Sequence, residues 1–186
     1  MAKKRTEKGS AKAQILETAM QLFKEQGING TSLNDIATAA SLSKGTLYYY
    51  YPAKDGLVED IIAINTDVIT EMFFAWVSSV DRRSTAEETI EELLGSILEQ
   101  DDLCKLHTVI SVEASRNPVA AQLLNEKYNQ WAVILEMGTL KIRPREAQLI
   151  TKRAPLFFTL LNGCMLDKAS GIETDIKELA HIFLAK

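Results

Sequence analysis

The chain has 186 residues, long enough for one ordinary domain or two small ones, and folding removes from water roughly 70% of the surface that such a chain exposes when unfolded. It is 46% hydrophobic and 25% charged, with four prolines and nine glycines, which excludes disordered, collagen-like and low-complexity chains. No apolar run reaches the ~18 residues of a membrane helix, and the two cysteines are too few for a disulfide framework, so we expect a cytoplasmic protein with no membrane partner.

The net charge of −4 is unevenly distributed along the chain. Residues 1–54 hold eight basic and four acidic side chains, a net charge of +4, whereas the other residues together carry −8. A basic head joined to an acidic body indicates that one end of the protein meets a polyanion.

Apolar residues recur at helical spacing through the first third of the chain. A first helix ends at about residues 27–30, where two glycines offer C-caps. Ser32 then offers an N-cap for a short helix over residues 32–40. A turn at residues 41–43 leads to a second short helix at residues 44–51. Pro52 ends that second helix, because the residue before a proline is steered out of the helical region.

The remainder of the chain continues the helical pattern. Ser84 and Glu87 form a capping box, and Asn117 followed by Pro118 marks another helix start. Further helices are expected at about 54–80, from 84, around 103–110, from 117, at about 143–170 and from about 175. No stretch alternates with a period of two, so the sequence predicts an all-α protein of about nine helices.

The two short helices and their three-residue turn have the dimensions of a helix-turn-helix. In that motif the second helix is anchored by apolar residues and presents its other face to phosphates and base edges. Leu47 and Tyr51, four residues apart, can face the first helix and Ile36 of the first short helix. The side chains left to point elsewhere are Lys44, Thr46, Tyr48, Tyr49 and Tyr50. A row of phenols suits a DNA backbone better than a core, because each buried hydroxyl needs a partner.

The spacing of these residues resembles the DNA-binding head of the tetracycline-repressor-like (TetR) family of bacterial regulators. The resemblance rests on Gln14-Ile15-Leu16-x-x-Ala19-x-x-Leu22-Phe23-x-x-x-Gly27, Thr31-Ser32-x-x-x-Ile36-Ala37-x-x-Ala40 and Leu42-Ser43-x-Gly45-Thr46-Leu47-Tyr48-x-Tyr50-Tyr51-x-x-Lys54-x-x-Leu57. It covers roughly residues 11–60, a third of the chain. The other two thirds match the family only in length and helicity.

The resemblance implies a regulator, most often a repressor, whose homodimer binds a palindromic operator in double-stranded DNA and whose C-terminal domain binds a small-molecule effector. The head then spans residues 1–53 and the ligand-binding and dimerisation domain residues 54–186. The alternative is a DNA-binding dimer without a small-molecule effector, controlled by a protein partner. A filled, dry core in the C-terminal domain would favour that alternative.

The resemblance also assigns the candidate DNA-binding residues. Those expected near base edges are Ser43, Lys44 and Thr46; those expected on phosphates are Thr31, Tyr48, Tyr49, Tyr50 and Lys54; Ser32 joins them as the cap of the first short helix.

Three positions depart from the family's usual pattern. Ser41 stands where glycine is usual, and a left-handed backbone there costs on the order of 1 kcal/mol. Tyr51 replaces phenylalanine, so its hydroxyl needs a partner or water. Ala53 replaces the usual hydroxyl or amide N-cap of the next helix, a loss of about 0.5–2 kcal/mol, which suggests a hinge between head and body.

Helix 143–170 carries apolar residues on two sides, and the second stripe is expected to pack, together with the last helix, against a partner chain. Bulky side chains on facing helices are candidates for the lining of an effector cavity, although each of them can equally be core. The candidates are Met72, Phe73, Trp76, His107, Ile110, Tyr128, Trp131, Phe157 and Leu161.

Enzymatic chemistry finds little support in the sequence. Cys104 and His107 are three residues apart, but Cys164 and His181 are the only other cysteine and histidine, too few for a clear metal site. No glycine-rich phosphate loop, nucleophile elbow or H-E-x-x-H motif occurs. We therefore expect no catalytic site, no metal and no cofactor.

Overall fold

The computed structural model describes residues 2–81, 83–142 and 144–184, with the side chains of all of these except residues 2–10, 142 and 144–149. Within these ranges the chain forms nine α-helices and no strand, which confirms the predicted all-α fold. The helices are α1 (Ala2–Gly30), α2 (Leu33–Ala39), α3 (Lys44–Tyr50), α4 (Lys54–Ser79), α5 (Ala86–Leu98), α6 (Asp101–Ala114), α7 (Pro118–Ile142), α8 (Pro144–Ala169) and α9 (Ile176–Leu184).

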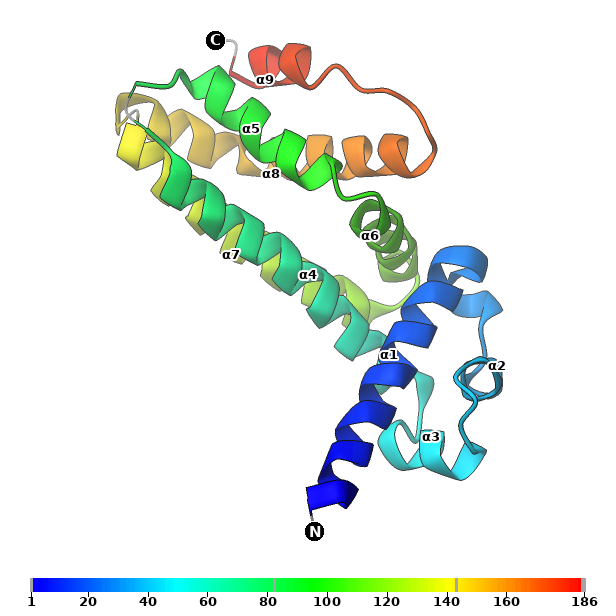
Figure 1. Cartoon of the computed structure of the whole chain (residues 1–186). Helices are drawn as coiled ribbons and strands as arrows, with labels where there is room; N and C mark the ends of the chain where they lie inside the picture. The colour runs from blue at the N-terminus through cyan, green and yellow to red at the C-terminus, as the bar shows by residue number, and fades with distance from the viewer. Residues whose placement is uncertain (1, 82, 143, 185–186) are drawn as a thin grey trace.

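The helices form a small head and a larger body (Figure 1). Helices α1, α2 and α3 gather at the end of the molecule where the N-terminus lies. From there α4 and α7 run side by side into the body, where α7 also packs on α8 and α5 packs on α9. Helix α6 lies where head and body meet and contacts α1, α7 and α8.

Most helix ends follow the caps expected from the sequence. Gly27 has a φ of 75° and interrupts α1 one turn before its end at Gly30. Asn117 Oδ1 accepts from the backbone of Val119 and Ala120 and so caps α7. Gly171, with a φ of 74°, follows the end of α8.

One predicted cap is corrected by one residue. The capping box of α5 is formed by Thr85 and Glu88, not by Ser84 and Glu87. Thr85 Oγ1 accepts from the Glu88 backbone N–H at 3.1 Å, and the Glu88 carboxylate accepts from the Thr85 N–H at 2.8 Å. Both pairs have the hydroxyl-to-acid spacing of three, so the sequence alone does not distinguish the two registers.

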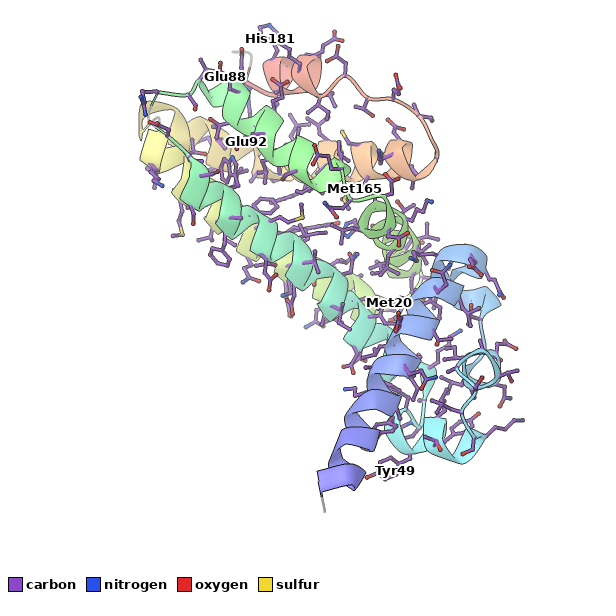
Figure 2. The ribbon with its side chains drawn as sticks, viewed as in Figure 1. Met20, Tyr49, Glu88, Glu92, Met165 and His181 are labelled. Atoms are coloured by element: carbon purple, nitrogen blue, oxygen red, sulfur yellow. The ribbon has the colours of Figure 1, made fainter. Side chains whose placement is uncertain are left out.

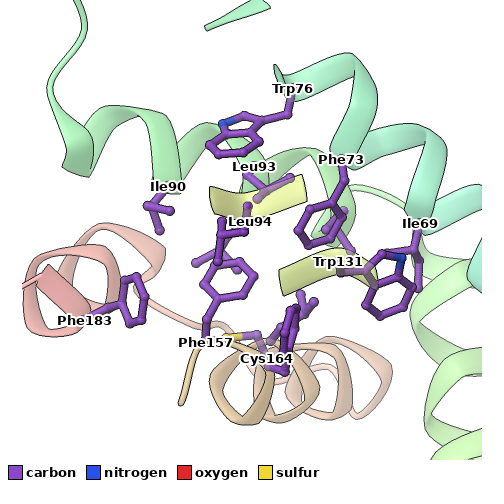
Figure 3. Packing of buried hydrophobic residues seen from close by; sticks show 14 of the residues in the cluster. Ile69, Phe73, Trp76, Ile90, Leu93, Leu94, Trp131, Phe157, Cys164 and Phe183 are labelled. Atoms are coloured by element: carbon purple, nitrogen blue, oxygen red, sulfur yellow. The ribbon is translucent and has the colours of Figure 1, made fainter. Parts of the chain in front are cut away.

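The buried apolar residues form two clusters that share α4. The first, here called the head core, contains Ile15, Ala19, Phe23, Ile28, Ile36, Ala37, Leu47, Tyr51, Leu57, Val58, Ile61, Ile62, Leu106, Ile110, Ala120 and Leu124. The second, the body core, extends from Ile69 on α4 to Phe183 on α9 and holds most of the buried rings (Figure 3). Between Ile62 and Ile69 the buried residues of α4 are polar, Asn65 and Thr66.

Within the described part of the chain, α4 alone is long and apolar enough to cross a membrane by length and composition. The most apolar 18-residue segment of α4 has a mean hydropathy of 1.3, and 44% of it is buried inside the protein. The buried side chains belong to both apolar cores, as expected of the central helix of a globular protein, so this finding is weak evidence for a membrane span.

Candidate DNA-binding surface and ligand site

Two hydroxyl caps and a left-handed turn set the geometry of α2 and α3. Ser32 Oγ accepts from the Asp35 backbone N–H, and the Asp35 carboxylate accepts from the Ser32 N–H at 2.8 Å. These bonds from Ser32 hold the pKa of Asp35 below its usual range. Ser43 Oγ accepts from the Thr46 N–H at 3.0 Å and so starts α3. Ser41 lies between the helices with a φ of 53°, the strained position that the sequence suggested.

The inner face of α3 anchors it to the rest of the head. Leu47 is fully buried and Tyr51, the C-cap of α3, is nearly so. Both belong to the head core together with Phe23 of α1 and Ile36 of α2. This is the contact that the i, i+4 spacing of Leu47 and Tyr51 predicts.

The outer face of α3 is open to solvent. Tyr48 is 44% and Tyr49 65% exposed, and Ser43 and Lys44 are also exposed. Figure 2 shows Tyr49 at the tip of the head, far from the body. The Tyr49 and Tyr50 rings meet edge to face, with centroids 5.2 Å apart. The candidate DNA-binding residues with exposed side chains are Ser32, Ser43, Lys44, Tyr48 and Tyr49, and those half-buried are Thr46, Tyr50 and Lys54.

Thr31 and Lys54 differ from the expectation that both face a phosphate. The Thr31 side chain is buried, and its hydroxyl donates to the Gly27 carbonyl at 2.9 Å. The Lys54 ammonium donates to the carbonyls of Ile28 at 2.7 Å and Thr31 at 3.1 Å. Carbonyls at a helix end lack intrahelical partners and attract a cation, so Lys54 ties the start of α4 to the end of α1. Thr31 is a structural residue of the head.

Tyr51 finds the hydroxyl partner that its sequence position requires. Its Oη donates to the Asp60 carboxylate of α4 at 2.7 Å, and Lys12 of α1 pairs with the same carboxylate at 2.8 Å. The hydrogen bonds from Lys12 and Tyr51 lower the pKa of Asp60, whereas burial and the Asp60 carboxylate raise the pKa of Tyr51. The sequence signalled only that Tyr51 needed a partner; Asp60 and Lys12 were missed.

The start of α4 has the weak cap that the sequence predicts. Ala53 is the N-cap residue and makes no side-chain cap hydrogen bond. Lys54 and Asp60 nevertheless bind the first two turns of α4 to the head, and Leu57, Ile61 and Ile62 lie in the head core. The uncapped end is therefore held by tertiary contacts.

The rings of the ligand candidates Phe73, Trp131 and Phe157 lie together in the body core (Figure 3). Phe73 stacks on Trp131 with ring centroids 5.6 Å apart and meets Phe157 edge to face at 6.3 Å. The ring centroids of Tyr128 and Trp131 are 5.5 Å apart. Leu161 is buried in the same cluster, whereas Ile110 belongs to the head core. These contacts are those of residues that fill a core.

His107 joins three helices through a chain of polar side chains. Its Nδ1 lies 2.9 Å from Asn65 Oδ1 of α4, and its Nε2 lies 3.0 Å from Asn162 Oδ1 of α8. Asn162 also exchanges hydrogen bonds with the Tyr128 hydroxyl of α7 at 2.9 and 3.0 Å. Burial lowers the pKa of His107 to about 4, so the imidazole is neutral at pH 7. His107 is thus a buried neutral histidine, and because a neutral imidazole carries a single N–H it donates to one of the two amide oxygens.

Two ligand candidates line open space. Met72 and Trp76 border a cavity of about 260 Å³ between α4 and α5, whose other lining residues are Ala75, Ser79, Glu92 and Ser96. The Trp76 indole N–H is already bound to the Thr89 carbonyl at 2.8 Å. A cavity of this size falls below the usual range of drug-sized sites, about 300–1,000 Å³.

The expected dimer face is exposed in the single chain. On α8, Leu156 and Leu166 are 47% and 50% exposed, and Gly163 lies between them in the same stripe. Ile182 of α9 is 56% exposed. Large apolar side chains at helical spacing on the surface of two adjacent helices are typical of a surface that another chain covers.

Among the described residues, no group of three histidine, cysteine or acidic side chains is placed to hold a metal ion. Cys104 and Cys164 are both buried. Burial raises the pKa of the Cys104 thiol to about 11, so it is not a ready nucleophile at neutral pH.

Comparison with known proteins agrees with this geometry. Residues 15–61, which span α1 to the second turn of α4, match the model of the family described as bacterial regulatory proteins, tetR family. The chain is 27% identical over 173 residues to the HTH-type transcriptional regulator UidR of Escherichia coli, covering 92% of this chain and 84% of that one. It is 25% identical over 138 residues to the HTH-type transcriptional repressor KstR2 of Rhodococcus jostii, covering 70% and 66%.

Solved structures share the whole fold. A putative transcriptional regulator from Saccharomonospora viridis, solved in complex with choline, superposes with a TM-score of 0.74 at 20% identity, over 95% of this chain and 96% of that one. At this identity the likeness concerns the fold alone.

Proposed function

This chain belongs to the TetR family and is a helix-turn-helix transcriptional regulator, not an enzyme, and on that premise we propose that it binds a palindromic operator as a homodimer, represses transcription and is released by a small molecule. The observation that carries the proposal is the outer face of α3. There Lys44, Tyr48 and Tyr49 are exposed on a helix whose inner face packs in the head core.

In the proposed complex α3 enters the major groove, with Ser43, Lys44 and Thr46 at base edges. The Tyr48, Tyr49 and Tyr50 hydroxyls and Ser32 bind phosphates, which position the head without reading sequence. The +4 charge of residues 1–54 favours this contact, and the −8 charge of the body keeps the body away from the DNA. Residues 1–53 read DNA, residues 54–186 sense and dimerise, and the protein acts in the cytoplasm.

Dimerisation through α8 and α9 places two heads on one operator. Leu156, Leu166 and Ile182 supply the apolar area, and Gly163 allows two copies of α8 to approach closely. The two reading helices then need a separation of about 34 Å, one turn of DNA. An effector that binds a different head separation more tightly releases the operator, by as much as its affinities for the two states differ.

The relatives support repression and effector binding only by analogy, since KstR2 is described as a repressor and the S. viridis protein holds choline. The mutual packing of Phe73, Trp131 and Phe157 favours the second candidate, a regulator controlled by a protein partner in place of a ligand in the body core. Both candidates share the same reading head.

Selection of bound DNA from a random pool tests the head. We expect enrichment of a palindrome, and Lys44→Ala should weaken its binding by about 1–3 kcal/mol if Lys44 reads a base. Lys105→Ala is the control, because Lys105 is also exposed but lies on α6 in the acidic body. Binding should also weaken steeply with salt. Failure to enrich any sequence contradicts the proposed function.

A further inference from the structure

A groove lies where the head meets the body, and we name it the junction groove. It measures about 710 Å³, and its walls are formed by α1, α4 and α6 with Ala39 at the end of α2. Its apolar lining includes Met20 of α1, Ile64 and Val68 of α4, and Leu103 and Leu106 of α6. Figure 2 shows Met20 at the point where α1 approaches α4 and α6.

We propose that the junction groove is the effector site of this regulator and that it takes a small apolar molecule bearing an amine or quaternary ammonium group. The inference rests on the proposed function, gives it a ligand class, and places the site between α1 of the head and the body instead of within residues 54–186 alone. The volume lies within the range of small-molecule sites, about 300–1,000 Å³, and exceeds that of the cavity beside Trp76.

The charges at the rim favour a cation. The ionisable residues that line the groove are Glu17, Lys24 and Asp102. The Lys24 ammonium pairs with the Asp102 carboxylate at 2.9 Å, which leaves the exposed Glu17 carboxylate as the uncompensated charge among these three. A positive group on the ligand can bind at Glu17 while its apolar part lies on Val68 and Leu103.

The close packing of the rings in the body core argues against a ligand site among them. Phe73, Trp131 and Phe157 are almost fully buried. The ring centroid of Phe73 lies 5.6 Å from that of Trp131 and 6.3 Å from that of Phe157. A ligand there must first separate packed rings, which forfeits their contacts. The junction groove is already open, so binding requires no such repacking.

The position of the groove couples binding to the head. The Lys24–Asp102 ion pair crosses from α1 of the head to α6, with the Lys24 side chain only 13% exposed. Asn65, on the groove wall, is buried and contacts His107, which reaches Asn162 of α8. A ligand wedged between α1 and α6 therefore acts on the head on one side and, through the His107 chain, on the proposed dimer helix on the other.

Calorimetry on the full chain without DNA tests the site. The probes are hexyltrimethylammonium, hexanol and hexanoate, which share the apolar part and differ in charge. We expect the cation to bind at least ten-fold more tightly than hexanoate, with hexanol between them. Equal affinity for the cation and the anion overturns the proposed ligand class.

Variants locate the probe. Val68→Trp fills the groove and should reduce hexyltrimethylammonium affinity at least ten-fold, whereas Val112→Trp, at a similarly exposed valine of α6 outside the groove lining, should leave it unchanged. Glu17→Gln should reduce the affinity several-fold and Glu71→Gln, on the exposed side of α4, should not. If Val68→Trp binds the probe as the parent does, the probe lies elsewhere and the proposal fails.

The operator measurement is separate. Saturating hexyltrimethylammonium should weaken binding to the selected operator at least ten-fold in the parent and not in Val68→Trp. Groove binding that leaves operator affinity unchanged overturns the effector role. If no operator can be selected, the proposed function fails while the calorimetric test of the groove still stands.

Discussion

The head core and the body core are built differently although both include α4. The head core is mostly aliphatic, with Phe23 and Tyr51 as its rings, and it surrounds two short capped helices. The body core contains two tryptophans and four phenylalanines on long helices, and every one of these rings except that of Trp76 contacts another. The head thus depends on local caps and a few anchors, whereas the body depends on rings that meet across long sequence distances.

The two cores meet within α4, not at its start. The proposed functional division falls between residues 53 and 54, yet Leu57, Ile61 and Ile62 pack with the head. The polar residues Asn65 and Thr66 then separate the head core from Ile69 of the body core. The first two turns of α4 therefore pack with the head, and the polar layer is the alternative to Ala53 as the pivot of a tilting head.

Removal of a body-core ring should have the largest effect. Phe73→Ala is expected to lower the free energy of unfolding by about 3–5 kcal/mol, because it leaves a cavity beside Trp131 and Phe157. Phe74→Ala, the next residue and 48% exposed, is the control and should have little effect. Urea unfolding followed by circular dichroism and by tryptophan fluorescence measures both.

The same experiment tests whether the cores unfold together. Both tryptophans lie in the body core, whereas circular dichroism reports all the helices. Because α4 is continuous through both cores, we expect the two signals to coincide in the parent chain. A fluorescence transition that precedes the loss of helicity contradicts this expectation and makes the cores independent units.

Acid should destabilise the protein through His107. Its pKa is about 4 in the fold and near 6.5 when unfolded, so the unfolded state binds more protons between these values and stability falls as the pH drops. We expect a loss of about 2–3 kcal/mol between pH 7 and pH 4.5. His107→Gln should remove this slope, whereas His181→Gln, at the exposed second histidine, should retain it. Chemical denaturation at several pH values measures the slopes.

The contact that ties α3 to α4 should contribute less. Tyr51→Phe removes the hydrogen bond to Asp60 and is expected to cost about 1 kcal/mol, since the carboxylate stays partly solvated. Tyr48→Phe removes an exposed phenol and should leave stability unchanged. Equal melting temperatures for the two variants would show that the Tyr51–Asp60 bond contributes nothing measurable.

Repair of the α4 cap should have the smallest effect. Ala53→Ser supplies the missing side-chain acceptor and should stabilise the fold by about 0.5–1 kcal/mol. If the start of α4 is the hinge, the same variant strengthens operator binding or blunts effector release. If α4 pivots at the polar layer, stability rises and operator affinity stays the same, which a filter-binding titration decides.

Local features were predictable because their causes lie within a few residues. The capping serines Ser32 and Ser43, the left-handed Ser41 and the anchors Leu47 and Tyr51 all follow from short spacings. The capping box of α5 was misplaced by one residue because two hydroxyl–acid pairs overlap there. The family resemblance assigned Thr31 to a phosphate, and its sequence position does not show that the residue is buried.

The sequence by itself determined an all-helical chain, a helix-turn-helix head and the split of its charge into a basic head and an acidic body, since periodicity, caps and charge are properties of neighbouring residues. Only the tertiary structure decided that Phe73 and Trp131 stack, that His107 bridges α4 and α8, and that a groove opens between α1 and α6. The three side-chain contacts join residues 42, 55 and 58 positions apart, and a local pattern does not specify which distant side chains will meet.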